Sequence, residues 1–376
     1  MSWNKTYGQT RIKEILQRAI VGERIAGGYL FSGEIGFGTE AIAQEFAKIL
    51  NCPDPIISGE NVKTSETFDK KYEHNILSHP NIELIVPMPT GKNAGPKTDS
   101  PMDSLSQDQI AEIQSEYEKK SRDYYHEIIL DKANKIRISQ IRELKKKLKL
   151  SQSVSGRRVI IISQAHLMGQ EASNALLKTL EEPNQKTTLI LTTNNYEALL
   201  PTIISRTQHI KFPPISDSEI RRCLLENNIS SENPELAVKL ARGSVSNLQK
   251  VNSAEAEDLQ ANAIQMMRTA LKKRYRIDLT NSITEIVSKK DKNIIREYLT
   301  FYANWFSDIL KFNSGVNING SDNYLKITEK FSLNFGNKDL HLAVKYCQEA
   351  FQTIDQNVNP NLIFISLFIK LRKVFL

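Results

Sequence analysis

Cysteine is scarce in this sequence, with three residues among 376. Cys52, Cys223 and Cys347 lie far apart and form no Cys-x-x-Cys pair, which excludes a disulfide framework and a four-cysteine zinc site. Long apolar runs are missing too. The most apolar stretch, 362–369, is too short to span a bilayer, and residues 1–18 lack the apolar core of a signal peptide. We therefore expect a cytoplasmic location and no contact with a membrane.

A strong excess of one charge sign is also missing. The 50 basic and 43 acidic side chains give a formal net charge of +7 and a pI near 9.0. The basic excess is small for so many charged side chains, and it is compatible with a polyanionic partner but does not predict one.

The first half of the sequence alternates β-type and helical segments. The continuous β-branched run 159–162 is typical of a parallel strand that is covered on both faces. Three further runs predict strands at 29–33, 82–86 and 188–193. Helical periodicity lies between the runs and predicts helices at 39–50, 136–150 and 174–180. Strands that alternate with helices predict an α/β domain with a parallel sheet.

The β signals end after Pro214, and the remainder of the chain is helical in pattern. Short helical segments extend to residue 251, and long amphipathic segments follow them without any internal repeat. The pattern predicts an α/β domain over 1–213, a small helical domain over 214–253 and an all-helical domain over 254–376. Its last segment, 361–376, is apolar on nearly all sides, so we expect it to be buried between other helices.

An insertion of about 87–130 interrupts the α/β pattern. Its first part, 87–107, is dense in Pro, Gly, Ser, Thr, Asp and Lys and has no periodicity, which predicts an exposed, mobile segment. The part from 108 to 125 has helical propensity but few apolar anchors, which predicts a solvated helix. We interpret the insertion as a tolerated surface feature, with a lineage-specific partner site as the alternative.

A glycine-rich loop lies between the first strand and the helix that follows it. A phosphate-binding loop needs glycines so that backbone N–H groups can wrap the phosphates, a lysine to neutralise them, and a Ser or Thr to hold magnesium. Gly33, Gly36 and Gly38 meet the first requirement. Thr39 stands where the lysine belongs and Glu40 where the magnesium ligand belongs, and a carboxylate there would repel a triphosphate. We expect no nucleotide and no metal cofactor, with a small anion on the helix N-terminus left open.

The second element of an ATPase site is an apolar strand that ends in acidic residues, one for magnesium and one to polarise the attacking water. Here the strand 159–162 is followed by Ser163 and Gln164, and neither serves as an anionic ligand or a general base. His166 has acid-base capacity, but we interpret it as a structural hydrogen-bonding residue. Two independent parts of one site are missing together, which argues for a nucleotide site that has been lost.

Six motifs occur in a characteristic order: YGQ at 7–9, YLFSG at 29–33, HP at 79–80, ISQIREL at 138–144, NALLKTLEEP at 174–183 and PTIISR at 201–206. In these motifs the chain resembles the gamma/tau and delta-prime subunits of DNA polymerase III, a clamp-loader family. The resemblance covers most of residues 1–250, and NALLKTLEEP is its most specific part. It implies an AAA+ P-loop-type base domain with a five-stranded parallel sheet (1–213), a small helical lid domain (214–253) and a helical collar domain (254–376).

The departures from the family pattern point towards its delta-prime branch. Motor subunits keep a complete phosphate-binding loop and an Asp-Glu pair, which this chain lacks. Ser246 stands where a motor subunit has a phosphate-sensing arginine, and of the family's four-cysteine zinc module only Cys52 is present. Thr192, Thr193 and Asn194 occupy the position of a γ-phosphate sensor, and we interpret them as structural.

One functional motif of the family is retained. Ser205-Arg206-Thr207 resembles its Ser-Arg-Cys motif, whose arginine points across a subunit interface at the ATP of a neighbour. A guanidinium supplied in trans stabilises the charge that develops on a transferring γ-phosphate. The resemblance therefore implies that Arg206, with Ser205 beside it, is a catalytic residue for the adjacent subunit. The alternative is a surface arginine after a strand.

The resemblance also implies a role and its partners. The chain would complete a heteropentameric clamp-loader ring without ATPase activity of its own, beside gamma/tau motor subunits and the delta subunit. It would act on the sliding clamp (beta) indirectly, and direct contact with primer-template DNA stays open. Three alternatives are an active motor ATPase, a delta-type clamp-opening subunit and an AAA-derived scaffold outside replication. The retained Arg206 and the segment 174–183 disfavour the delta-type alternative.

Overall fold

The structure, a computed structural model, describes residues 3, 5–72, 75–89, 102, 105–149, 154–182, 186–227, 229, 234–250, 253–288, 292–318, 322–354 and 358–376. The chain forms two compact units. The first comprises Met1–Ile220 with Gly243–Ser246, and the second comprises Arg221–Arg242 with Asn247–Leu376. The finer division into three domains at residues 213 and 253 stays a prediction.

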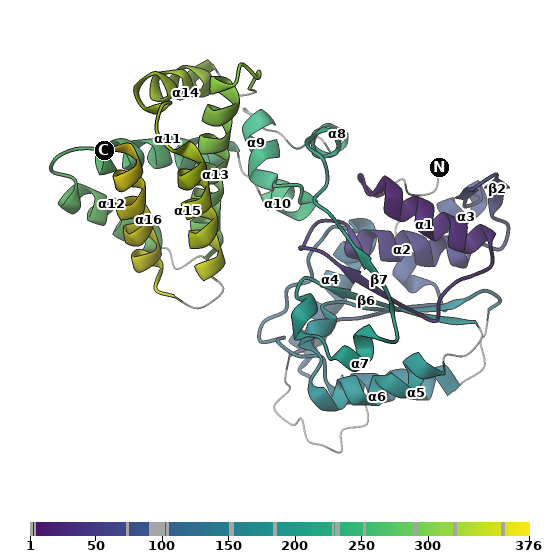
Figure 1. Ribbon diagram of the computed structural model, residues 1–376. Helices are drawn as coiled ribbons and strands as arrows, with labels where there is room; N and C mark the ends of the chain where they lie inside the picture. Colours follow the sequence, from purple (N-terminus) through teal and green to yellow (C-terminus); the bar gives the residue numbers. More distant parts are fainter. Residues whose placement is uncertain are drawn as a thin grey trace. The chain divides into compact units, whose positions relative to one another are not determined.

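A five-stranded parallel sheet forms the centre of the first unit (Figure 1). Its strands lie in the order β4 (Ile82–Ile85), β5 (Arg158–Ile162), β6 (Thr187–Thr193), β1 (Gly28–Ser32) and β7 (Gln208–Lys211). The central strands β6 and β1 are buried along their whole length, as expected when helices cover both faces of a sheet. The predicted α/β fold with a five-stranded parallel sheet is confirmed.

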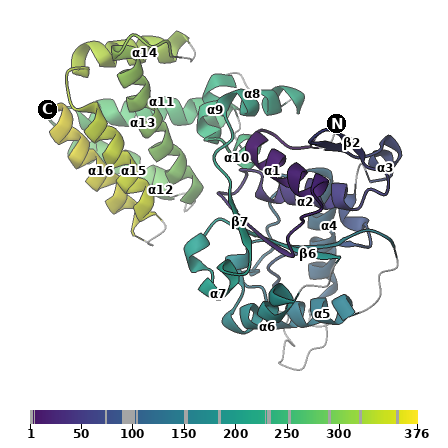
Figure 2. The same cartoon turned by 45° about the vertical axis from the view of Figure 1, so that its right-hand side comes forward.

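Helices cover both faces of this sheet (Figures 1 and 2). One face carries α1 and α2; the other carries α5, α6 and α7, where buried residues such as Ile141, Leu176 and Ile203 share a core with the strands. The remaining elements of the unit are short, apart from the inserted helix α4. The bounds are α1 (Thr10–Val21), α2 (Thr39–Leu50), β2 (Ile56–Ser58), β3 (Asn61–Lys63), α3 (Glu66–Lys71), η1 (Ile76–Ser78), α4 (Gln107–Arg122), α5 (Ile138–Lys149), η3 (Ala165–Leu167), α6 (Gln170–Glu181), η4 (Tyr196–Ala198) and α7 (Pro201–Ile204).

Helix α4 is more buried than its sequence predicted. A capping box fixes its first turn: the N–H of Gln109 donates to Oγ of Ser106, and Oε1 of Gln109 accepts from the N–H of Ser106. Ile113, Glu116 and Lys120 are buried. The expectation of a solvated helix is therefore wrong, because the polar residues of α4 find partners inside the unit. The predicted mobile segment lies mostly outside the described residues, at 90–101 and 103–104.

The second unit is helical in the part that the structure describes. Its core is aromatic: Tyr302, Trp305 and Phe306 of α13 pack with side chains of α16 that include Phe368. The last helix, α16, packs against α11, α12 and α15, as expected of a helix buried between others, although Leu362 at its start is 59% exposed. The bounds from the unit boundary onwards are α8 (Asp217–Glu226), α9 (Pro234–Ala241), α10 (Val245–Lys250), α11 (Ser253–Ala270), α12 (Arg276–Ser288), α13 (Lys292–Asn313), α14 (Asp322–Phe335), α15 (Leu340–Thr353) and α16 (Pro360–Phe375). No helix among the described residues has the length and apolar character needed to cross a membrane.

Candidate functional site

The loop between β1 and α2 needs its glycines for packing. Gly36 and Gly38 have φ values of 83° and 95°, a backbone conformation that residues with a Cβ rarely adopt. A Cβ on Gly36 would lie 2.1 Å from Oγ of Ser244, and a Cβ on Gly33 would lie 2.8 Å from Cβ of Phe212. The neighbours of the loop therefore require glycine at these positions, whether or not a phosphate binds.

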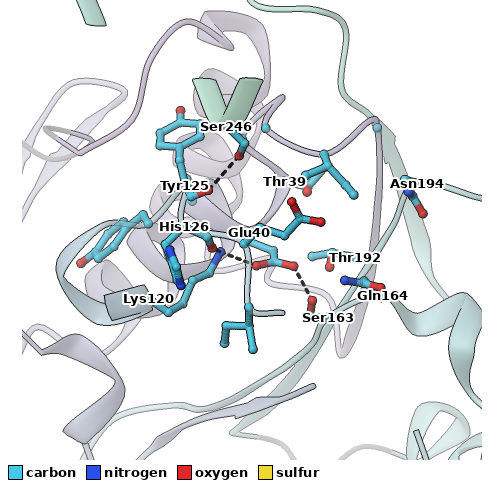
Figure 3. Close-up of a pocket in the computed structure, with 18 of the residues that line it drawn as sticks. Thr39, Glu40, Lys120, Tyr125, His126, Ser163, Gln164, Thr192, Asn194 and Ser246 are labelled. Atoms are coloured by element: carbon cyan, nitrogen blue, oxygen red, sulfur yellow. Dashed lines mark hydrogen bonds and ion pairs between the residues drawn. The ribbon is translucent and has the colours of Figure 1, made fainter. Parts of the chain in front are cut away.

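Glu40, in the first turn of α2, is paired with a cation from α4 (Figure 3). Nζ of Lys120 lies 2.5 Å from Oε2 of Glu40, and the hydroxyl of Ser163 donates a hydrogen bond to Oε1. The side chain of Lys120 is 3% exposed and that of Glu40 is 22% exposed. The charge of Glu40, which the sequence predicted would repel a triphosphate, is thus already compensated within the chain.

This pair sets the protonation state of Glu40. Burial by itself raises the pKa of the carboxyl, but the charge of Lys120 and the hydrogen bonds from Lys120 and Ser163 outweigh burial and hold the pKa below its ordinary value of 4.5. Glu40 is therefore ionised at neutral pH. Nζ of Lys120 also donates to the carbonyl oxygen of His126 at 2.7 Å, so the ammonium group has partners on both sides.

Residues 123–128, which follow α4, will be called the α4 strap. Tyr125 is its anchor. The phenol oxygen of Tyr125 accepts a hydrogen bond from the N–H of Tyr7 at 2.9 Å, and its carbonyl oxygen accepts one from the hydroxyl of Ser246 at 2.8 Å. A Cβ on Gly38 would approach the phenol oxygen to 3.2 Å. The strap is thus fixed to the N-terminal segment, to the glycine loop and to the turn that contains Ser246.

The cavity enclosed by the loop, α4, the strap and the strand ends is small. Its volume is about 50 Å³, and its lining includes Thr39, Glu40, Ser163, Gln164 and Lys120. Pockets that hold drug-sized ligands measure roughly 300–1,000 Å³. Nucleotide binding here would require α4 and its strap to move. Among the described residues, no cluster of three or more His, Cys, Asp or Glu side chains is arranged to hold a metal ion.

The strand ends that face the loop carry neutral polar groups. Ser163 and Gln164 follow β5, and the buried Thr192 and Thr193 end β6. Oγ1 of Thr193 lies 3.0 Å from Nδ1 of His166. Burial lowers the pKa of His166 from its ordinary value of 6.5, so the imidazole is neutral at pH 7. A neutral histidine bonded to a threonine is the arrangement expected of a structural residue.

Arg206 does not line this cavity. It follows α7, and its Nη2 lies 2.7 Å from Oε1 of Glu181 at the end of α6. Its Nη1 donates to the carbonyl oxygen of Thr202 and to Oγ of Ser205, both at 3.1 Å. The side chains of Arg206 and Glu181 are 35% and 46% exposed. The guanidinium is therefore oriented by its own turn and remains accessible to solvent.

The structure brings together the loop and strand-end residues that the sequence singled out, and it adds Lys120 and Tyr125, which the sequence did not reveal. Lys120 lies in a run of charged residues that includes Lys119 and Arg122, and its spacing does not distinguish it. The available signal was Glu40, because a largely buried carboxylate needs a cation or hydrogen-bond donors to compensate its charge.

A family model described as "DNA polymerase III, delta subunit" matches residues 8–216, which is more than half of the chain. The chain belongs to this family. The resemblance to DNA polymerase III clamp-loader subunits is thereby confirmed at the level of the family.

Relatives in this family carry several subunit names. The delta-prime subunit of DNA polymerase III from Bacillus subtilis is 29% identical over 258 residues, which are 68% of this chain and 60% of the relative. The tau subunit from the same organism is 28% identical over 213 residues, 57% of this chain and 29% of the relative. The chain thus spans less than two thirds of the length of these relatives. A solved structure of a DNA polymerase III gamma subunit-related protein from Thermotoga maritima aligns over 97% of this chain and 100% of its own, with a TM-score of 0.42 and 15% identity.

Removing one member of the Lys120–Glu40 pair is expected to destabilise the first unit. Lys120→Met leaves a carboxylate without its cation, which costs about 3–5 kcal/mol of unfolding free energy. The double variant Lys120→Met, Glu40→Gln keeps an acceptor for Ser163 and should recover most of this loss. Urea unfolding followed by the fluorescence of Trp3, with Trp305 replaced by Phe, measures both. Equal stability of wild type and Lys120→Met would show that the pair contributes nothing.

The contribution of the pair should also depend on pH. The folded-state pKa of Glu40 lies below its ordinary value of 4.5. The stabilising effect of the ionised carboxylate is therefore present at pH values above 4.5, and it is lost as the pH falls through the lowered pKa. The stability advantage of the wild type over Glu40→Gln should therefore shrink between pH 5 and pH 2. A difference that stays constant over this range would contradict the assignment.

Proposed function

We propose that this chain is a non-hydrolysing, delta-prime-type subunit of the DNA polymerase III clamp loader. In this role it completes the ring and presents Arg206 to the ATP of a neighbouring gamma/tau-type motor subunit. Its other partners would be the delta subunit, the sliding clamp through the assembled ring, and the primer-template DNA on which the clamp is loaded.

The closed state of its own nucleotide site is the observation that carries this proposal. The cation of Lys120 is committed to Glu40, the strand end offers Ser163 and Gln164 in place of acids, and about 50 Å³ of space remains. An active ATPase needs a lysine on the phosphates, a magnesium ligand and an acid to polarise water. The motor alternative would need residues from outside the site to supply all three functions, so it is the weaker proposal.

The accessible guanidinium of Arg206 supports the role in trans. An ion pair between two exposed groups contributes at most about 1 kcal/mol, so the bond to Glu181 is easily exchanged for a stronger one. A triphosphate carries several negative charges and would compete with a single carboxylate for the same donors. Nη1 of Arg206 donates to Oγ of Ser205 and to the carbonyl oxygen of Thr202. The side chain is therefore already restricted, and it loses less conformational entropy on binding. The role is that of an arginine finger.

The test is steady-state ATP hydrolysis by the reconstituted clamp loader with clamp and primed DNA. Arg206→Ala should lower turnover at the adjacent motor site by about a hundredfold or more, because it removes the charge that stabilises the transition state. Arg206→Lys should restore little, since lysine lacks the planar pair of donors. The isolated chain should be inert.

Arg11, an exposed arginine of α1, provides the matched control. Arg11→Ala should leave turnover unchanged, and size-exclusion chromatography should show intact complexes for all three variants. Unchanged turnover in an intact Arg206→Ala complex would rule out the finger, and hydrolysis by the isolated chain would favour the motor alternative.

A further inference from the structure

Two segments of the second unit carry basic side chains and no acidic ones. Residues 259–277 contain five basic and no acidic side chains, and residues 356–376 contain three basic and none acidic. Another basic stretch, 132–158, belongs to the first unit, where Lys147 is paired with Glu83.

The fold brings these two segments into contact. Arg372, near the end of α16, donates from Nη1 to the carbonyl oxygens of Ala270 and Lys272, at 2.9 Å for the second. Its Cζ lies 4.0 Å from the ring centroid of Tyr275, a cation–π contact. Figure 1 shows the C-terminus beside the end of α11. The turn from α11 to α12 is thus held against the end of α16.

This junction forms what will be called the basic end patch, which consists of Lys272, Lys273, Arg274, Arg276, Arg372 and Lys373. Five of the six side chains are exposed, and Arg372 is partly buried. Within the part of the chain that the structure describes, no carboxylate forms an ion pair with any of them. By contrast, Lys370, one turn earlier on α16, is paired with Glu349 at 3.0 Å.

Helix ends account for only a small part of this charge. The C-termini of α11 and α16 both lie at the patch, and cations stabilise the partial negative charge there. Each terminus carries roughly half an elementary charge, so two of them offset about one of the six cations. Among the described residues, some five of these positive charges are therefore not compensated by a carboxylate or a helix end. The patch is held on a frame of buried residues of α12 and α16 such as Ile283 and Leu371. A rigid surface with this much uncompensated positive charge is suited to bind a polyanion.

We infer that the basic end patch binds the phosphate backbone of DNA without sequence preference. The patch mixes lysine and arginine, which both bind phosphate. The ring of the neighbouring Tyr275 is covered by Arg372, so it does not offer a free face for base stacking. The choice of DNA over an acidic protein segment rests on membership in a DNA polymerase III family. It does not depend on Arg206, which lies in the other unit.

The experiment measures binding of the full chain to a fluorescein-labelled duplex of arbitrary sequence by anisotropy, over a series of salt concentrations. The patch variant carries Lys272→Glu, Lys273→Glu and Arg274→Glu. The control variant carries the same charge change on three lysines of the same unit that lie outside the patch, the exposed Lys326 and Lys330 and the partly buried Lys338, as Lys326→Glu, Lys330→Glu and Lys338→Glu. Circular dichroism melting confirms that both variants fold, and replacing the three patch residues by Gln supplies a milder variant.

The patch variant should bind the duplex at least tenfold more weakly than wild type at low salt, and the control should lie within about threefold. The slope of log K against log salt should become shallower by about two to three for the Gln variant, since each lost phosphate contact removes about 0.9. Equal binding by the patch and control variants would overturn the inference. So would patch-dependent binding of a poly-glutamate peptide without duplex binding, which would identify an acidic protein segment as the partner instead.

Discussion

The ion pair between Lys120 and Glu40 is the interaction on which the candidate site depends. It joins the inserted helix α4 to the first turn of α2, and the Ser163 hydroxyl ties the same carboxylate to the end of β5. A buried pair is costly to break from one side, because the remaining charge loses its partner. In a working nucleotide site, phosphates and a metal ion carry the charges beside the glycine loop. Here the side chains of Lys120 and Glu40 carry the opposite charges, so each charge has its partner within the protein.

A closed nucleotide site and an accessible arginine fit together in a ring of non-identical subunits. Head-to-tail interfaces use a different surface on each side of a subunit. In the proposed role, the chain would act through the surface that presents Arg206, and its own nucleotide site would need no function. The α4 strap is held in place by the hydrogen bonds of Tyr125 with Tyr7 and Ser246, which are made within the chain.

Much of the first unit was predictable because buried parallel strands are apolar without interruption, as at 159–162. Strand β7 was harder, since it lies at the sheet edge and buries only Ile210 of its four residues. The sequence indicated a lost nucleotide site, because missing lysine and acidic residues can be read directly. The sequence did not indicate which side chains occupy the site in place of the missing lysine and acidic residues. The contact of Lys120 with Glu40 joins positions that are distant in sequence, and the charged pattern of α4 is the same as that of a solvated helix.

The central claim is that the chain's own side chains close its nucleotide site. It is tested most directly by thermal unfolding of the isolated chain with increasing Mg²⁺-ATP. A ligand that binds the folded state adds RT ln(1 + [L]/Kd) to the free energy of unfolding, so Tm keeps rising with the ligand concentration. We expect no rise in Tm at millimolar nucleotide. A concentration-dependent rise that Thr39→Glu abolishes would contradict the claim, because nucleotide would then bind in the cavity between the glycine loop and the α4 strap.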